Sequence, residues 1–213
     1  MGSRIRSLVL CAVAVTACGE RRDAADLAVG VEPFERLRGM NVAPLRSGAV
    51  RAMRANAEPA PLEGLRERIG AYDVLYSLTG FDGSDGSWPS EEALVLAIEA
   101  TREWPSDSAA LGGYRGAIRQ LQAGLGKPPT CATVTGPGFT MRIAEWDQGG
   151  GWSVSTSFAA GDASVTPALP AVHSIAVRRE ALTAQLPRHD QPNPDKRATW
   201  MATDCTTGEE VPE

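Results

Sequence analysis

A short apolar segment at the N-terminus decides how much of this chain is available to fold. Arg4 and Arg6 precede an uncharged apolar run from Leu8 to Ala17. This run has ten residues, about half of the roughly 20 that a transmembrane helix needs. A positively charged start and a short apolar core are typical of a secretory signal peptide, which is removed after export. We therefore expect residues 1–17 to be cleaved and the remaining 196 residues to fold outside the cytoplasm.

The apolar run ends in small residues directly before a cysteine, in the order Val15-Thr16-Ala17-Cys18. In this feature the chain resembles bacterial lipoproteins, whose lipobox ends in such a small-residue pair and the acceptor cysteine. The resemblance implies cleavage after Ala17 by signal peptidase II and a diacylglycerol thioether on Cys18. It covers the leader alone and implies nothing about the mature fold. The alternative is an ordinary signal peptide that is cut near Ala17, with Cys18 as a bystander.

The same resemblance gives an expected location in the cell envelope. Two or more acyl chains hold a protein stably on a membrane, whereas one chain binds only marginally. Gly19 is not the aspartate that retains many bacterial lipoproteins in the inner membrane, so the outer membrane is favoured. The expected partners are therefore the membrane, through the lipid on Cys18, and an envelope protein or cell-wall component.

Residues 18–61 have the composition of a lipidated N-terminus followed by a flexible tether. Phe34 is their only aromatic residue, and they end in Glu58-Pro59-Ala60-Pro61. A fully coiled segment of this length has a root-mean-square reach of roughly 35–40 Å. A short helix around 45–57 would reduce this reach. The rest of the chain, residues 62–213, is then expected to form a single globular domain.

Three helices are predicted in the first half of that domain. Over 62–78, apolar residues recur at steps of three or four, which is the stripe of an amphipathic helix. A second helix is expected to begin at Ser90, which is a good N-cap, and to end at Trp104 before a proline. The third prediction covers 111–125, whose apolar positions again step by three and four and are followed by glycines and prolines: Leu111, Tyr114, Ile118, Leu121 and Leu125.

After Thr130 the composition changes to threonine, serine, valine and aromatic residues. Alternation of apolar and polar residues predicts an antiparallel hairpin over 139–158, with three consecutive glycines in its loop. Further strands are expected at 173–177 and 199–203, and a short helix at 179–186. The predicted fold class is α+β, with three N-terminal helices packed on a C-terminal antiparallel sheet.

Two cysteines remain besides Cys18 once the leader is removed. Outside the cytoplasm such a pair usually forms a disulfide, so we expect Cys131 and Cys205 to be linked. The alternative is a metal site, but neither cysteine has a second cysteine or a histidine at ligand spacing.

The acidic segment from Phe81 to Glu92 is the nearest feature to a binding motif. Asp82, Asp85 and Glu92 are candidate calcium ligands, although two positions of a regular calcium loop lack oxygen donors. The alternative is a glycine-rich turn before an N-capped helix. His189, Asp190 and Asp195 are a further candidate metal group, for which a solvated loop is the simpler interpretation.

Catalytic motifs are not evident in the sequence. His173 lies in an apolar, strand-like run, and no Gly-x-Ser-x-Gly pentapeptide marks a serine hydrolase. The mature chain carries a net charge of −7 and lacks the basic footprint of a nucleic-acid binder. The favoured hypothesis is a non-catalytic envelope lipoprotein without a cofactor, which binds a partner through its tethered domain. The alternative is a lipid-anchored hydrolase that uses one of the histidines or the acidic segment.

Overall fold

The structure is a computed structural model, which describes residues 24–38, 45–60, 64–79, 89–136, 139–162, 168–179 and 199–211. Its helices are α1 (Ala24–Gly30), α2 (Glu32–Arg38), α3 (Ser47–Met53) and α4 (Asp107–Leu125). Its strands are β1 (Glu58–Ala60), β2 (Gly64–Ile69), β3 (Tyr72–Leu78), β4 (Val95–Trp104), β5 (Thr130–Gly136), β6 (Phe139–Gly149), β7 (Trp152–Ala159), β8 (Ala171–Arg178) and β9 (Thr199–Ala202). None of the described helices is long and apolar enough to cross a membrane.

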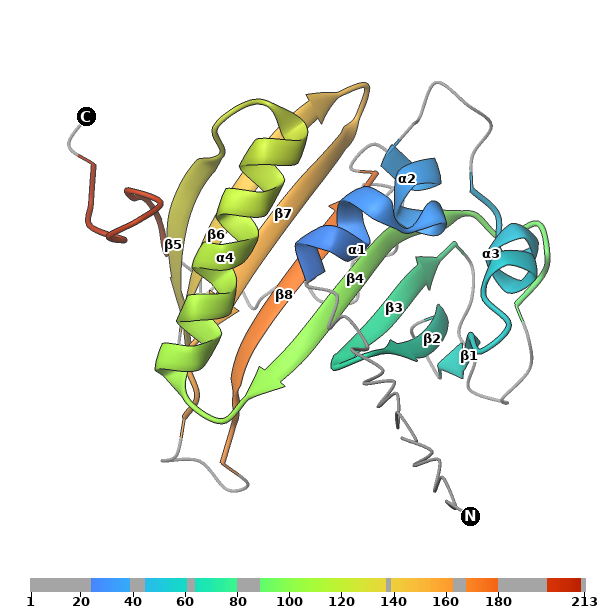
Figure 1. The fold of residues 1–213 in the computed structure, drawn as a ribbon, viewed down its shortest axis with the longest axis horizontal. Coiled ribbons are helices and arrows are strands. Elements are labelled where there is room, and N and C mark those ends of the chain that lie inside the picture. The colour runs from blue at the N-terminus through green and yellow to red at the C-terminus, as the bar shows by residue number, and fades with distance from the viewer. Residues whose placement is uncertain are drawn as a thin grey trace, which may run out of the picture.

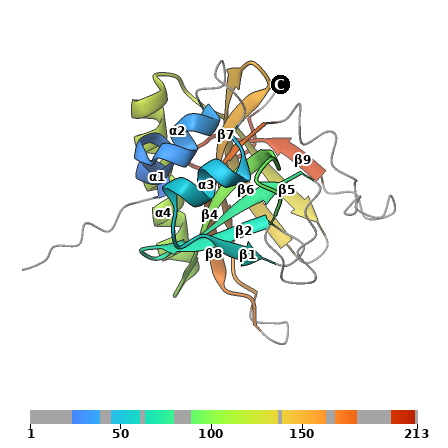
Figure 2. The same ribbon diagram turned by 90° about the vertical axis from the view of Figure 1, so that its right-hand side faces the viewer.

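The strands form one antiparallel sheet in the order β1-β2-β3-β4-β8-β7-β6-β5-β9. Strand β4 pairs with β8, and α4 carries the chain across the intervening strands to β5. Figures 1 and 2 show that the described helices lie on one side of this sheet. The mixed α+β class is therefore confirmed, but the finer prediction of three N-terminal helices on a C-terminal sheet is not matched.

The hydrophobic core lies between the sheet and the helices. Alternate side chains of each strand point toward the helices, so that Tyr76 pairs across the sheet with Ile98, and Ile98 with Val177. The largest fully buried side chains come from both layers and include Leu27, Phe34, Leu37, Tyr76, Ile98, Leu121, Trp146 and Ile175. Burial of one such side chain stabilises the fold by about 1.5–3 kcal/mol.

The predicted helix over 62–78 is wrong, because this segment forms the hairpin of β2 and β3. Ile69 pairs with Tyr72, and the two residues between them make the turn, with Gly70 at φ 60°. A positive φ is readily adopted by glycine and suits a two-residue hairpin loop. The side chains from Tyr72 to Leu78 alternate between buried and more exposed, which is the period of a strand.

The predicted helix between Ser90 and Trp104 is also wrong, because its apolar part forms strand β4. This strand has neighbours on both sides, β3 and β8. Its first four residues, from Val95 to Ile98, are all buried. A run that is apolar at consecutive positions suits a strand buried on both faces as well as a buried helix, and periodicity alone does not separate them.

The prediction of a flexible tether is wrong for residues 24–38 and 45–60. These residues fold into α1, α2, α3 and β1. Leu27 and Phe34 are fully buried in the core. The segment before α3 is fixed to the start of β4, because the Val95 N–H donates to the Leu45 carbonyl at 2.9 Å. The short helix expected around 45–57 corresponds to α3.

Several local predictions are confirmed. The third predicted helix is α4, which Ser106 caps by accepting a hydrogen bond from the Ala109 N–H, and which ends at Gly126 in the left-handed region. The 139–158 hairpin is formed by β6 and β7 with three glycines of positive φ in its turn. The strands expected at 173–177 and 199–203 are β8 and β9. The helix expected at 179–186 lies outside the described residues, apart from Arg179.

Candidate functional site: a charged groove on the outer strands β1 to β3

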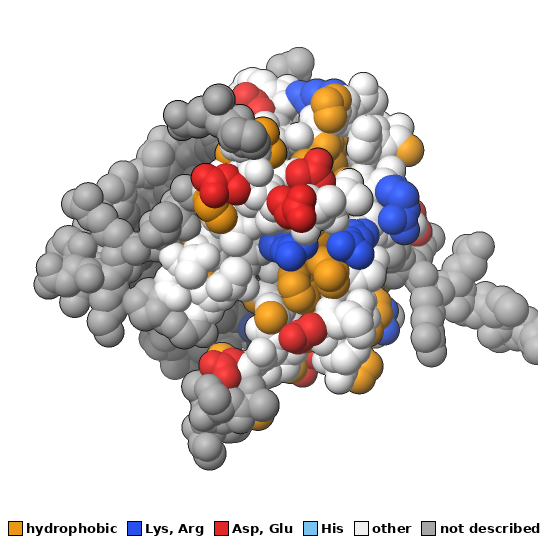
Figure 3. All heavy atoms as spheres, turned by 90° about the vertical axis from the view of Figure 1, so that its left-hand side faces the viewer, with side chains coloured by type: hydrophobic (Ala, Val, Ile, Leu, Met, Phe, Trp, Pro, Cys, Tyr) orange, Lys and Arg blue, Asp and Glu red, His pale blue; other side chains and the backbone are white. Residues whose placement is uncertain are grey.

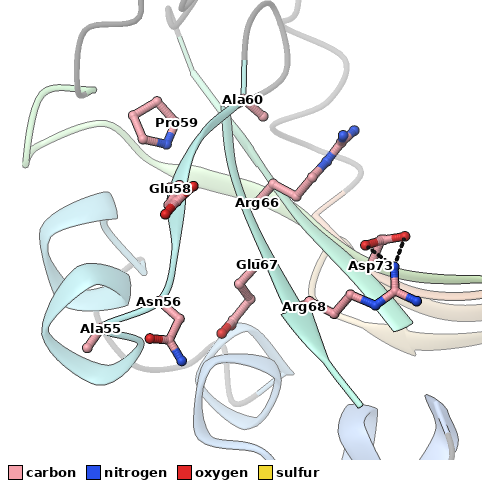
Figure 4. A pocket seen from close by; sticks show the side chains of 9 residues that line it. All are labelled: Ala55, Asn56, Glu58, Pro59, Ala60, Arg66, Glu67, Arg68 and Asp73. Atoms are coloured by element: carbon pink, nitrogen blue, oxygen red, sulfur yellow. Dashed lines mark hydrogen bonds and ion pairs between the residues drawn. The ribbon is translucent and has the colours of Figure 1, made fainter. Parts of the chain in front are cut away.

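A groove with a volume of about 610 Å³ runs over β1, β2 and β3 and the turn after α3. Figure 4 shows the side chains around it. Most of them are polar or charged, so the groove is suited to a polar ligand rather than an apolar one. The lining residues are Ala55, Asn56, Glu58, Pro59, Ala60, Arg66, Glu67, Arg68 and Asp73.

The pleat of the sheet decides which of these side chains face solvent. On β2, Leu65 and Glu67 are buried, whereas Arg66 and Arg68 are exposed. On β3, Asp73 lies opposite Arg68 in the register. Figure 4 shows Arg66 and Arg68 extending to one side of β2 and Glu67 to the other. Arg66, Arg68 and Asp73 thus belong to the sheet face that carries none of the described helices.

Arg68 and Asp73 form an ion pair that water still reaches. The Arg68 Nη1 atom lies 3.1 Å from each carboxylate oxygen of Asp73. The two side chains are 64% and 53% exposed, and such a surface pair contributes about 0–1 kcal/mol. The guanidinium of Arg68 can therefore exchange its partner for a carboxylate or phosphate of a ligand at little cost.

A buried polar cluster holds β2 in place beneath the groove. Arg54, which follows α3, donates from Nε and Nη2 to the two carboxylate oxygens of Glu67, at 2.8 and 3.0 Å. The hydroxyl of Tyr76 also donates to Glu67. The Glu67 side chain is 1% exposed. Burial and this hydrogen bond raise the pKa of Tyr76 above its usual value, so the phenol stays protonated.

Gly64 begins β2 in a conformation that other residues rarely adopt. Its φ is 136°, and a Cβ at this position would lie 2.0 Å from the Tyr76 carbonyl oxygen. The close approach of β2 to β3 at the groove therefore requires glycine at position 64.

Some of the sequence-predicted site residues are brought together and others are not. Cys131 and Cys205 form a disulfide, with their Cα atoms 5.3 Å apart. Glu92 is exposed and pairs with Arg46, with an Oε2–Nη1 distance of 2.5 Å. Outside the described residues lie Cys18 and the remaining calcium and metal candidates: Asp82, Asp85, His189, Asp190 and Asp195.

His173 is a core residue on β8 rather than an accessible base. Its side chain is fully buried and lies edge-on to Tyr72, with 6.5 Å between ring centroids. A Cβ on Gly113 of α4 would lie 3.2 Å from His173 Nδ1 and 2.7 Å from a ring carbon of Trp104. The helix backbone therefore packs directly against both rings.

The hydrogen bonds of Thr156 define the tautomer of His173. The Thr156 hydroxyl donates to the Ser174 carbonyl at 2.9 Å and lies 3.0 Å from His173 Nε2. Because a hydroxyl has one proton to donate, Nε2 must be the donor to Thr156, and in the neutral imidazole Nδ1 is then unprotonated. Burial, with a smaller contribution from the Arg102 charge, lowers the pKa of His173 to about 4.

This low pKa predicts that His173 destabilises the fold in acid. The unfolded chain, with an ordinary histidine pKa of 6.5, binds a proton that the folded chain excludes. The contribution of His173 to the free energy of unfolding is therefore complete above pH 6.5 and decreases as the pH falls toward 4. The expected loss at the lower limit is about 3 kcal/mol. Urea unfolding of the wild type and His173→Gln between these pH values measures it.

The comparison with His173→Gln is needed because carboxylates also titrate in this range. The difference between the two proteins isolates the histidine, since glutamine has a similar polar group but does not titrate. Parallel pH profiles for the two proteins would contradict a neutral, buried His173.

The described residues place no three His, Cys, Asp or Glu side chains together as metal ligands. On the face seen in Figure 3, acidic and basic side chains are interspersed with hydrophobic ones. The groove over β1 to β3 brings five charged side chains together: Glu58, Arg66, Glu67, Arg68 and Asp73.

The groove residues were missed in the sequence because they were assigned to the polar face of a helix. Two signals indicate the hairpin instead: the Gly70-Ala71 pair, and the alternation from Tyr72 to Leu78.

Comparisons of this chain with protein-family models, with curated protein sequences and with solved structures find no match.

Proposed function

We propose that this protein is a cell-envelope lipoprotein, anchored through a lipid on Cys18, whose folded domain binds a partner without catalysis. The observation that carries the proposal is the sequence Val15-Thr16-Ala17-Cys18 after a charged and apolar leader. The Cys131–Cys205 disulfide supports it, because structural disulfides persist mainly in oxidising compartments outside the cytoplasm. The outer membrane is the favoured location, because Gly19 follows the cysteine.

The charged groove is the proposed binding site for the partner. Arg66 and Arg68 offer guanidinium groups, and Glu58 and Asp73 offer carboxylates, all on three adjacent strands. Mixed charges of this kind favour a ligand that carries both signs, such as a peptide segment of an envelope protein or of the cell wall. The alternative of a hydrolase that uses His173 has no support from the geometry, because this imidazole is fully buried.

Replacement of Cys18 tests the anchor. Cys18→Ala removes the only proposed lipid acceptor, so the expressed protein should move from the detergent phase to the aqueous phase on Triton X-114 partitioning. Cys11→Ala, within the leader, is the matched control and should leave the partitioning unchanged. A Cys18→Ala protein that stays in the detergent phase would contradict lipidation at this residue.

Photo-cross-linking in the native cell tests the groove. A benzoylphenylalanine at position 66 should give an adduct of defined mass, and the additional change Arg68→Glu should weaken it. The same cross-linker at position 119, an exposed site on α4, is the control and should give no such adduct. Equal adducts at the two positions would show that the groove is not the partner site.

A further inference from the structure

The folded domain begins very close to the proposed lipid anchor. Helix α1 starts at Ala24, six positions after Cys18. A fully extended chain spans at most about 3.6 Å per residue, so the start of α1 lies within roughly 20 Å of the acylated cysteine. This distance limit constrains the orientation of the domain on a membrane only if Cys18 carries the lipid, so the inference rests on the proposed function.

Helix α1 lies over the middle of the sheet rather than at its margin. It packs against β8 and β4 and against α4, and Figure 1 shows it in front of the central strands. Strands β4 and β8 are the fourth and fifth of the nine strands in spatial order. Leu27 and Ala28 of α1 are fully buried, so the helix is fixed in this position.

A chain this short cannot pass around the domain to the other face of the sheet. Strands lie about 4.8 Å apart, so either side edge is roughly 15–20 Å away from α1. The helix layer and the sheet together add a thickness of roughly 20 Å. The route around either edge is therefore roughly 35–40 Å long, well beyond the available length. A route past the ends of the eight-residue β8 needs roughly 30 Å and is excluded too.

We infer that the lipid-anchored domain stands on the bilayer with its helix layer toward the lipid headgroups and with the sheet face opposite the described helices directed away. The occupant of the surface formed by α1, α2 and α4 is the bilayer itself. Arg66, Arg68 and Asp73 lie on the opposite face, so this charged wall of the groove is directed toward soluble or wall-attached partners. The short connection thereby orients the binding site in addition to tethering it.

Headgroup quenching in vesicles tests this orientation. The full lipidated protein is reconstituted into phosphatidylcholine vesicles that contain a nitroxide-headgroup lipid. One variant carries a fluorescent amino acid in place of Arg36, which is exposed on α2. A second variant carries it in place of Glu103, which is exposed on the face of β4 opposite the described helices. Most of the fluorescence at position 36 should be lost, whereas position 103 should lose little. Equal quenching, or stronger quenching at position 103, would overturn the orientation.

A matched variant and a mass measurement separate the possible failures. Insertion of a 30-residue Gly-Ser segment between Glu20 and Arg21 should abolish the difference between the two positions, because the longer chain reaches around the sheet. A difference that persists after the insertion would overturn tether length as its cause. Mass spectrometry of the N-terminal peptide detects the lipid independently of the quenching. A peptide without lipid would contradict both the anchor and the orientation. A lipidated protein with equal quenching at the two positions would contradict the orientation alone.

Discussion

Glu67→Ala should lower the free energy of unfolding by about 3–5 kcal/mol. The Glu67 side chain is 1% exposed and accepts hydrogen bonds from Arg54 and Tyr76. Its removal leaves the Arg54 guanidinium, itself only 26% exposed, without its carboxylate. It also removes the carboxylate to which the fully buried hydroxyl of Tyr76 donates. Removal of one partner from a buried ion pair costs more than the pair contributes, because an uncompensated charge remains.

Urea unfolding of the wild type, Glu67→Ala and Asp73→Ala checks this expectation. Asp73→Ala is the matched control, because it breaks an Arg–carboxylate pair on the same hairpin that is more than half exposed on both sides. Its expected cost is at most about 1 kcal/mol. If Glu67→Ala does not fold, Tyr76→Phe removes one hydrogen bond of the cluster and should cost about 1–2 kcal/mol. Equal stabilities of Glu67→Ala and Asp73→Ala would contradict the role of the buried cluster.

This cluster also explains why the hairpin was not predicted from the sequence. Glu67 occupies a helix-facing position of β2 between Leu65 and Ile69, so a charged residue interrupts the apolar alternation of the strand. Its partner Arg54 is 13 positions away, outside any local pattern. Without knowledge of that contact, the steps between Leu65, Ile69 and Tyr72 favour a helix. Because of the same misassignment, the groove residues Arg66, Arg68 and Asp73 were not recognised as parts of one site.

Elements that depend on local signals were predicted well. Helix α4 has its stripe, its Ser106 cap and its Gly126 terminus within 21 consecutive residues. The β6–β7 hairpin has its alternation and its glycine turn in one segment. The pairing of β4 with β8 joins residues about 70 positions apart, such as Trp104 with Ala171, so it follows from three-dimensional packing alone. The same holds for the position of α1 over the centre of the sheet.

The double variant Cys131→Ala/Cys205→Ala should lower the free energy of unfolding by about 4 kcal/mol. The disulfide closes a loop of 74 positions, and opening it gives the unfolded chain more conformations. It also ties the C-terminal segment 203–211 to β5, where the Thr203 N–H donates to the Cys131 carbonyl at 3.1 Å. A double variant is preferable to a single one, because it leaves neither disulfide partner as a free thiol.

The other contacts of this C-terminal segment are weak by comparison. Arg115 and Arg142 donate to the carbonyls of Thr206 and Thr207 at 3.0 and 3.1 Å, and both hydrogen bonds are exposed. The N–H groups of Thr207 and Thr206 lower the pKa of Asp204 by hydrogen bonding to its carboxylate, but they order only the local turn. Arg115→Ala is therefore the matched control and should cost at most about 1 kcal/mol.

Hydrogen exchange of the native protein distinguishes two ways in which the disulfide could act. If it acts on the unfolded chain, the double variant loses the same free energy of exchange at Ile175 in the buried sheet as at Thr203, since both then exchange through global unfolding. If it holds only the C-terminal segment, Thr203 loses protection and Ile175 keeps it. The wild type reduced with dithiothreitol should reproduce the double variant, because both lack the same cross-link. An unchanged exchange rate at Ile175 in both proteins would contradict the expected loss of about 4 kcal/mol.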